Sequence, residues 1–284
     1  MSAPDFNREP DRRPWHEGEI RARALAGAPD MPPAIRRCMT EQMRAFFPRL
    51  PMIFTAGIDV SGRPVASLLR GAPGFVACPE PQRLEIAAQA AAGDGLDLRP
   101  GAPFGLIGMD FLARRRNRVN GRIVEARDGR LALHVQEAFG NGPKYILPRL
   151  LYAAAGAPGT WRDVPSLDAV QQMISGADVF FIATRGPDGV DVSHRGGAAG
   201  FVQMAPDGAL VAPDFPGNRY FNTFGNLQHD KRASLLFVDF PAGRVVRLAG
   251  AARVDFDFAR SWRFTPAAAW LLDAGAPLGG AAEV

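Results

Sequence analysis

Short runs of apolar and β-branched residues alternate with tight-turn sequences along most of the chain. The turn sequences Val60–Gly62, Pro187–Gly189 and Pro206–Gly208 each stand between two such runs, and this pattern is typical of antiparallel strands joined by hairpins. We therefore expect a mainly β protein whose two halves follow one plan. In the second half the pattern predicts strands near residues 178–185, 190–195, 200–205, 208–213, 233–240 and 244–256.

A few segments carry the signals of helices instead. Pro32 and Pro33 suit the first turn of a helix whose apolar residues recur at helical spacing. Short strands with one helix between them are best closed as a small β-barrel. The three predicted helices span residues 32–48, 82–92 and 217–228.

The chain nearly repeats itself once, with a single one-residue gap in the first pair of matching segments. The order of the segments is the same in both halves, so we infer one ancestral domain that was duplicated and fused, rather than a solenoid of many short units. The matching pairs are Phe54–Val76 with Phe181–Val202, Leu106–Phe111 with Leu235–Phe240, and Asn120–Gly121 with Ala249–Gly250.

This repeat suggests where the domains begin and end. We expect an N-terminal arm over residues 1–30 and a first, degenerate barrel over 31–155. The stretch 156–165 is rich in Gly, Ala and Pro and is predicted to be the linker. The second barrel then spans residues 166–284.

Composition and charge narrow the class of protein. The chain is 284 residues long, 47% hydrophobic and 22% charged, which excludes a disordered or fibrous chain. No apolar run is long enough to cross a bilayer, and Met1–Glu19 lacks the apolar core of a signal peptide. We therefore expect a cytoplasmic protein with no membrane partner.

The formal charge of +4 raises the question of a nucleic-acid partner, but the basic residues are spread along the chain. Only Arg114–Arg118 forms a basic cluster, and we interpret it as a solvated strand edge. No nucleic-acid partner is expected. Cys38 and Cys78 lack the spacing of a metal site or a redox pair, so we expect two packed thiols and no metal.

Candidate binding residues lie in two places in the second half. In Asp191–Gly197 a strand runs into a Gly-rich stretch and places Ser193 and Arg195 on one face, which suits a phosphate. His194, between them, is either a contact to the cofactor or substrate or, equally, a packed or exposed neighbour, and it is left out of the predicted site. The second place is the segment Pro213–Leu227.

In that second segment Gly217 and Asn218 are predicted to open a helix, with Arg219 in its first turn. Free amides at a helix start favour an anion, and an Arg side chain adds a forked charged donor. Helical spacing brings Thr223 and Asn226 near the same face as Arg219. The two segments together predict a site for a phosphorylated ligand.

The order of these motifs resembles the pyridoxamine 5′-phosphate oxidase-like FMN-binding split-barrel family, over roughly residues 178–256. The family's Val-Ser-Pro-Arg-Gly strand stands here as Val192–Gly196, and its Pro-Gly-Phe-Val strand as Gly200–Val202. Its Pro-Asp-x-x-Gly-Asn stretch stands as Pro213–Arg219, followed by Asn226–Leu227. The resemblance implies two tandem FMN-binding split β-barrels, packed as an internal pseudo-dimer with FMN where they meet; homodimerisation stays open.

The first half looks like the companion barrel of tandem members of that family. Arg114–Gly121 matches the companion's Arg-rich motif throughout, whereas Gln136–Ile146 departs from its pattern at Ala138, Gly142 and Lys144. The resemblance implies that this second segment completes the flavin site from across the interface. Asn141 and Lys144 are its candidate contacts.

The residues singled out include no nucleophile, triad or carboxylate pair, so any redox chemistry would come from the flavin. We expect an FMN-dependent oxidoreductase whose small-molecule substrate and electron donor the sequence does not name. The chain lacks the family's carboxy-terminal Trp and Arg-Leu arrangement, having Ser261–Pro266 there, so vitamin B6 oxidation is not expected. The alternative is a non-catalytic flavin- or phospholigand-binding sensor, or a degenerate scaffold. The motif Trp15–Glu19 receives no role.

The first prediction concerns Arg219, taken as the chief phosphate anchor. Arg219→Ala should weaken FMN binding by about ten- to a hundredfold, because a charge-assisted hydrogen bond is lost. Riboflavin, which has no phosphate, should bind nearly as before. Titrating both flavins by fluorescence quenching measures this. If Arg219→Ala binds FMN as tightly as the wild type, Arg195 is the phosphate anchor instead.

The second prediction concerns stoichiometry. The first half lacks counterparts of Gly217, Asn218 and Asn226 and has Pro81–Leu84 at this place. One flavin per chain is therefore expected, and a flavin-to-protein ratio near two would contradict it.

Overall fold

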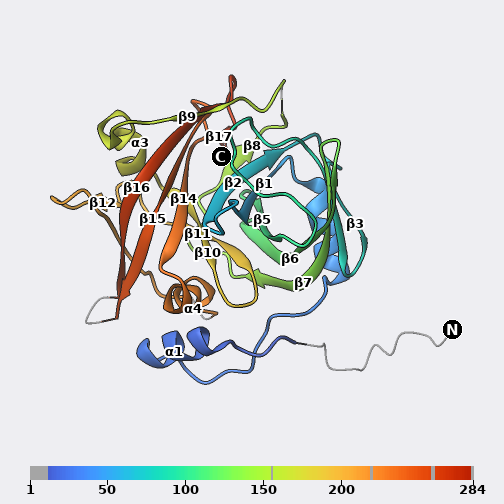
Figure 1. Ribbon diagram of the computed structural model, residues 1–284, viewed down its shortest axis with the longest axis horizontal. Helices are drawn as coiled ribbons and strands as arrows, with labels where there is room; N and C mark the ends of the chain where they lie inside the picture. The colour runs from blue at the N-terminus through green and yellow to red at the C-terminus, as the bar shows by residue number, and fades with distance from the viewer. Residues whose placement is uncertain (1–11, 155, 218–219, 257–259, 283–284) are drawn as a thin grey trace.

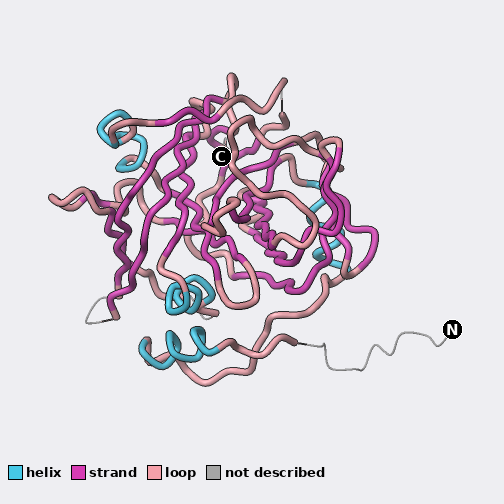
Figure 2. The backbone as a smooth tube through the Cα atoms, viewed as in Figure 1, coloured by secondary structure: helices cyan, strands magenta, loops and turns pink. Residues whose placement is uncertain are grey.

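Two antiparallel sheets with the same strand order make up most of the molecule (Figures 1 and 2). The computed structural model describes residues 12–154, 156–217, 220–256 and 260–282. The first sheet runs in the order β2 (Pro64–Arg70), β1 (Met52–Ile58), β5 (Pro103–Asp110), β6 (Arg115–Arg127), β7 (Arg130–Asn141), β4 (Arg83–Ala87) and β3 (Val76–Glu80).

The second sheet repeats this order with later strands, as the sequence repeat predicts. It runs β11 (Val190–Gly196), β10 (Val179–Arg185), β14 (Arg232–Asp239), β15 (Arg244–Asp255), β16 (Ser261–Asp273), β13 (Leu210–Pro213) and β12 (Gln203–Met204). Three short strands lie outside this plan. They are β9 (Trp161–Asp163), which pairs with β16 from within the predicted linker, and the pair β8 (Arg149–Leu151) and β17 (Gly279–Ala281).

Helices are few and short. In Figure 1, α1 lies beside α4 below the sheets. None of the described helices is long and apolar enough to cross a membrane. The helices are α1 (Glu17–Leu25), α2 (Glu41–Phe46), α3 (Gln171–Ser175) and α4 (Asn222–His229), with 3₁₀ turns η1 (Phe47–Arg49) and η2 (Leu167–Ala169).

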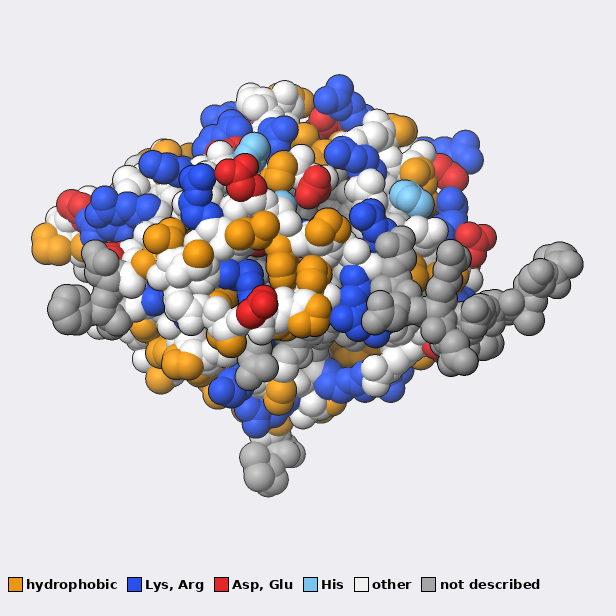
Figure 3. Space-filling view, turned by 90° about the horizontal axis from the view of Figure 1, so that it is seen from below, with side chains coloured by type: hydrophobic (Ala, Val, Ile, Leu, Met, Phe, Trp, Pro, Cys, Tyr) orange, Lys and Arg blue, Asp and Glu red, His pale blue; other side chains and the backbone are white. Residues whose placement is uncertain are grey.

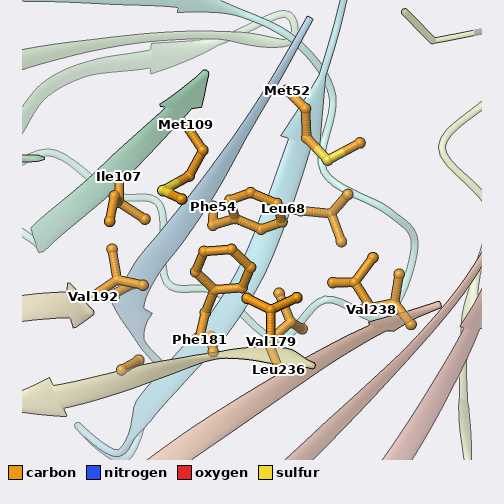
Figure 4. Packing of buried hydrophobic residues seen from close by; sticks show 14 of the residues in the cluster. Met52, Phe54, Leu68, Ile107, Met109, Val179, Phe181, Val192, Leu236 and Val238 are labelled. Carbon is orange, nitrogen blue, oxygen red and sulfur yellow. The ribbon is translucent and has the colours of Figure 1, made fainter. Parts of the chain in front are cut away.

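A shared core joins the two sheets. Phe54 of β1 and Phe181 of β10 stack with ring centroids 3.6 Å apart, and the interplanar angle is 14° (Figure 4). The sequence repeat aligns these two residues, so each half presents the same ring to the other. Each sheet also has a core of its own, centred on residues such as Leu106 in the first half and Leu235 in the second. The shared core is what an internal pseudo-dimer requires.

Both sheets bend at the same place. The register of β6 against β7 shifts between Asn120 and Gly121, and that of β15 against β16 shifts between Ala249 and Gly250. A side chain at either glycine would meet a backbone oxygen, because an added Cβ would lie 2.0 Å from the oxygen of His134 or 2.1 Å from that of Thr265. Glycine is therefore the residue that allows the strands to approach at each bulge.

Two of the predicted helices are wrong in extent or type. Residues 83–87 form strand β4, because Leu84 and Ile86 are buried while their neighbours are not, which is the period of a strand. The helix predicted over 32–48 is limited to α2 and η1. Thr40 caps α2 by accepting a hydrogen bond from the amide of Met43 at 3.2 Å.

The boundaries also differ around the predicted site. The helix predicted over 217–228 is observed as α4, which begins only at Asn222, after Phe221 in a left-handed conformation (φ 60°). The strand predicted near 200–205 is reduced to β12, since Phe201 closes a turn by donating to the oxygen of Ala198. Asn218 and Arg219 lie outside the described residues.

The bulge glycines give a prediction about stability. Gly250→Ala should lower the free energy of unfolding by about 1–3 kcal/mol, because the atoms that must move are backbone atoms of β16. Gly142→Ala is the matched control, since nothing lies within 4 Å of a Cβ added there. Urea denaturation of both variants measures the difference. Equal stability of the two would show that the close approach does not constrain the bulge.

Candidate functional site

A cavity of about 490 Å³ lies between the two halves. β6 and the segment after β7 supply the walls from the first half, and β11 and α4 supply those from the second. The cavity brings together five of the eight predicted binding residues, namely Ser193, Arg195, Thr223, Asn141 and Lys144. Asn226 is not among its lining residues, and Asn218 and Arg219 lie outside the described part of the chain.

The hydroxyl groups of the cavity are held in a chain of hydrogen bonds. Thr223 Oγ1 donates to Ser193 Oγ at 2.9 Å, and Ser193 Oγ donates to Asp191 Oδ2 at 3.3 Å. Residues two apart on a strand share a face, which is why β11 presents Asp191, Ser193 and Arg195 together. The two-residue period of a strand therefore accounts for the predicted shared face of Ser193 and Arg195.

Arg116 and Arg118 also line the cavity, so the interpretation of Arg114–Arg118 as a solvated edge is wrong for these two. Arg118 is only 4% exposed and pairs with Asp191 of the other half. These residues lie on β6, between β5 and β7, and β6 contacts β11 of the second half, which the local sequence does not reveal.

Arg116 is a cation without a carboxylate partner among the described residues. Its Nη1 donates to Nδ1 of His194 at 2.7 Å, and its Nε is buried without a partner. Burial, and then the charges of Arg118 and Arg195, lower the pKa of Arg116 to about 10. It is still charged at neutral pH, so the cavity has an uncompensated positive charge.

The neighbouring guanidinium of Arg195 is already paired. Its Nη1 donates to Asp214 Oδ1 at 2.6 Å, and Arg260 Nε donates to the other oxygen of the same carboxylate at 2.5 Å. One buried carboxylate therefore serves two cations here. Together with Lys144, these groups make the cavity favourable for an anion.

His194 is fully buried and neutral. Burial, followed by the charges of Arg116, Arg195 and Arg149, holds its pKa well below the usual value. Because Nδ1 accepts the hydrogen bond from Arg116, the proton lies on Nε2, which has no partner. His194 lines the cavity and accepts a hydrogen bond from Arg116, which helps to hold that side chain in place.

A second cavity of about 500 Å³ continues along β6, β7, β11 and α4. Asn226 lines this cavity. Its Oδ1 accepts from His16 Nε2 at 3.1 Å, and its Nδ2 donates to Thr184 Oγ1 at 3.0 Å. Burial lowers the pKa of His16, so it is neutral at pH 7. Thr223 and Asn226, which were predicted near one face of the helix, line different cavities.

The motif Trp15–Glu19 closes this second cavity by attaching α1 to α4. Glu19 is fully buried; it accepts from Asn222 Nδ2 at 2.7 Å and from Arg13 at 2.8 and 2.9 Å. Gly18 permits the contact, because a Cβ there would lie 2.2 Å from the oxygen of Gly225. His16 caps this helix, because its Nδ1 accepts from the amide of Glu19 while Glu19 Oε2 accepts from the amide of His16. No role was predicted for this motif from the sequence.

Two further carboxylates meet in this cavity. Asn120 Nδ2 donates to Glu137 Oε2 at 2.8 Å and to Asp191 Oδ1 at 3.1 Å. Burial raises the pKa of Glu137, and the charges of Asp191 and Glu19 add to this, although Arg13 and Asn120 oppose it. Glu137 is thus a carboxyl group able to gain a proton more readily than an exposed one.

Metal and thiol chemistry receive no support from the described residues, which contain no group of three or more His, Cys, Asp or Glu arranged for a metal ion. Cys38 and Cys78 are free, and burial raises the pKa of Cys78 to about 12.

On the face seen from below, basic side chains are spread among acidic and apolar ones (Figure 3).

Comparisons with solved structures give only distant likenesses. One is HupZ from Group A Streptococcus, with 13% identity and a TM-score of 0.32, covering 39% of this chain and 96% of that one. A FAD-binding protein from Mesorhizobium loti has 12% identity and a TM-score of 0.31, covering 40% and 96%. A nimC/nimA family protein from Clostridium acetobutylicum has 14% identity and a TM-score of 0.31, covering 40% and 91%.

The comparison with protein families is more specific. No curated protein matches the chain. Residues 166–268 match the model of the family described as pyridoxamine 5′-phosphate oxidase, and this region contains β11, α4 and the sheet that carries them. Over residues 166–268, therefore, the chain is similar to the family described as pyridoxamine 5′-phosphate oxidase.

Proposed function

We propose that the chain binds FMN in the 490 Å³ cavity and is an oxidoreductase acting on a small molecule. The observation that carries the proposal is Arg116, a half-buried cation in this cavity whose Nε is buried without a hydrogen bond and which has no carboxylate partner among the described residues. A buried charge without a partner is costly, and a phosphate group would supply the missing one. The volume also lies in the range of cofactor pockets.

The residues present fit such a group. Arg116 would hold the phosphate, with Lys144 and Arg195 contributing further positive charge. Ser193 and Thr223 offer hydroxyls from the opposite wall, and Asn141 an amide. Among the described residues, Arg116 is therefore the best candidate to anchor the phosphate of FMN. Arg219 remains the candidate predicted from the sequence.

FMN, when bound, supplies hydride and electron transfer, which the side chains themselves lack. The chain's own residues would bind and orient it and exclude water between the two halves. The second cavity, along the same four elements, would receive the reacting molecule. There the carboxyl of Glu137 could hold or release a proton, because its raised pKa brings it closer to neutral pH.

The purified protein tests this proposal directly. A yellow protein that takes up one FMN per chain, is reduced by NADPH or dithionite and is reoxidised by a trial acceptor supports an oxidoreductase. Binding without turnover favours the alternative, a flavin-binding sensor. A colourless protein that takes up no added FMN would leave only a scaffold.

The fourth prediction concerns the phosphate anchor. Arg116→Met should weaken FMN binding by about ten- to a hundredfold, because the charge-assisted hydrogen bonds to phosphate are lost. Riboflavin binding should change much less. The matched control is Arg130→Met, on the exposed end of β7. Fluorescence titration with both flavins measures the difference, and an equal loss for riboflavin would count against a phosphate contact.

The fifth prediction follows from the neutral state of His194. Below pH 6.5 the unfolded chain protonates this residue but the folded chain does not, so the folded state loses stability as the pH falls. His194→Asn keeps an acceptor and removes the titration. Between pH 7 and 5 the wild type should lose stability relative to the variant, with a slope approaching about 1.4 kcal/mol per pH unit. Parallel urea curves at each pH measure this; equal slopes would show that His194 is protonated in the fold.

A further inference from the structure

A smaller cavity of about 220 Å³ lies where the repeat places the counterpart of the proposed FMN cavity. Strand register supports the correspondence, because Arg116 pairs with Asn141 on β6 and β7, and Val245 pairs with Leu272 on β15 and β16. The two cavities are thus related by the repeat, one at each side of the shared core. The matching lining residues are His194 with Leu68, Gly196 with Arg70, Arg116 with Val245, and Asn141 with Leu272.

Substitution of the polar residues has made this smaller cavity mostly apolar. Leu68, Val245 and Leu272 replace a histidine, an arginine and an asparagine. Ala91 and Ala274 extend the apolar lining, and only Arg70 and Gln89 bring polar side chains. The cavity is too small for a flavin and offers no hydroxyl for its phosphate.

The internal cation on this side is already neutralised. Arg247, the counterpart of Arg118, donates from Nη1 to Asp94 Oδ1 at 2.8 Å and to the backbone oxygen of Asp94 at 2.7 Å. Ser67 Oγ donates to the same carboxylate at 2.9 Å. Arg247 therefore has no need of an external anion.

Arg70 differs in this respect. Its Nη1 and Nη2 are both buried and form no hydrogen bond. Burial lowers its pKa, and no carboxylate acts on it. Buried polar groups without partners are rare and point to a missing water or ion, and two adjacent guanidinium nitrogens match the two oxygens of a carboxylate.

We propose that this cavity binds a small monocarboxylate with a short apolar chain. The carboxylate would be held by the two terminal nitrogens of Arg70, and the chain would pack against Leu68, Val245 and Leu272. A water molecule occupies about 30 Å³ of liquid, so the cavity has room for about seven non-hydrogen atoms. Pentanoate has that size. The site is separate from the FMN cavity and does not depend on the proposed oxidoreductase activity.

Isothermal titration of the full chain with pentanoate tests the proposal. Saturable binding of pentanoate is expected, whereas pentanamide, which has the same shape without the charge, should bind at least about tenfold more weakly. Chloride and phosphate should not compete at equal concentration. Adding FMN should leave the affinity for pentanoate unchanged, so failure of the FMN proposal would not affect the result.

Two variants separate recognition of the head from recognition of the chain. Arg70→Met should abolish the preference for pentanoate over pentanamide without lowering stability in the absence of ligand, because an uncompensated buried cation is removed. Arg253→Met, on an exposed position of β15, is the matched control. Ala274→Leu fills part of the cavity and should weaken pentanoate more than acetate.

Each contrary result overturns the proposal in a distinct way. Absence of binding at 10 mM pentanoate, taken as roughly the weakest useful affinity, would show that Arg70 needs no anion. Equal binding of pentanoate and pentanamide, or unchanged binding by Arg70→Met, would remove the carboxylate contact. Chloride or phosphate binding as tightly as pentanoate would show an inorganic anion site with no role for the apolar chain.

Discussion

The stack of Phe54 on Phe181 is the contact on which the rest of the molecule depends. Each ring lies on the first strand of its own sheet, and the centroids are 3.6 Å apart within a core that both halves share. Because this core joins the two sheets, β6 and the end of β7 face β11 and α4 across a narrow space. Neither half could form the 490 Å³ cavity alone, since its charged wall comes from the first half and its hydroxyl wall from the second.

The sequence could predict what is local or periodic. The hairpins, the repeat and the shared face of Ser193 and Arg195 all follow from short spacings, and the structure places them as expected. What failed depends on contacts between distant segments. Arg118 was interpreted as solvated because its partner Asp191 is more than seventy positions away in the sequence. Residues 83–87 were predicted to be helical, because the sequence alone does not show that every second side chain is buried. The role of Trp15–Glu19 in covering the second cavity depends on where α4 lies, which the sequence does not show either.

Buried ion pairs across the two halves fix how they sit together. Arg118 of the first half pairs with Asp191 of the second, and Arg247 of the second pairs with Asp94 of the first. Each guanidinium also lies over an aromatic ring, Arg118 over Phe139 and Arg247 over Trp270. Such pairs add little net stability, but leaving one partner unpaired is costly. These ion pairs therefore favour one relative orientation of the two halves, while they add little to the free energy of unfolding.

The segment that follows β4 or β13 decides what each side of the interface becomes. After β13 the chain forms α4, whose Thr223 donates to Ser193 at 2.9 Å and leaves the cavity open. After β4 the equivalent segment has no described helix and places Asp94 where its carboxylate accepts from Ser67 and Arg247. That carboxylate neutralises Arg247, as Asp191 neutralises Arg118 on the other side. The connection after β13 thus adds a hydroxyl to the large cavity, whereas the apolar lining of the small cavity comes from Leu68, Val245 and Leu272 on its strands.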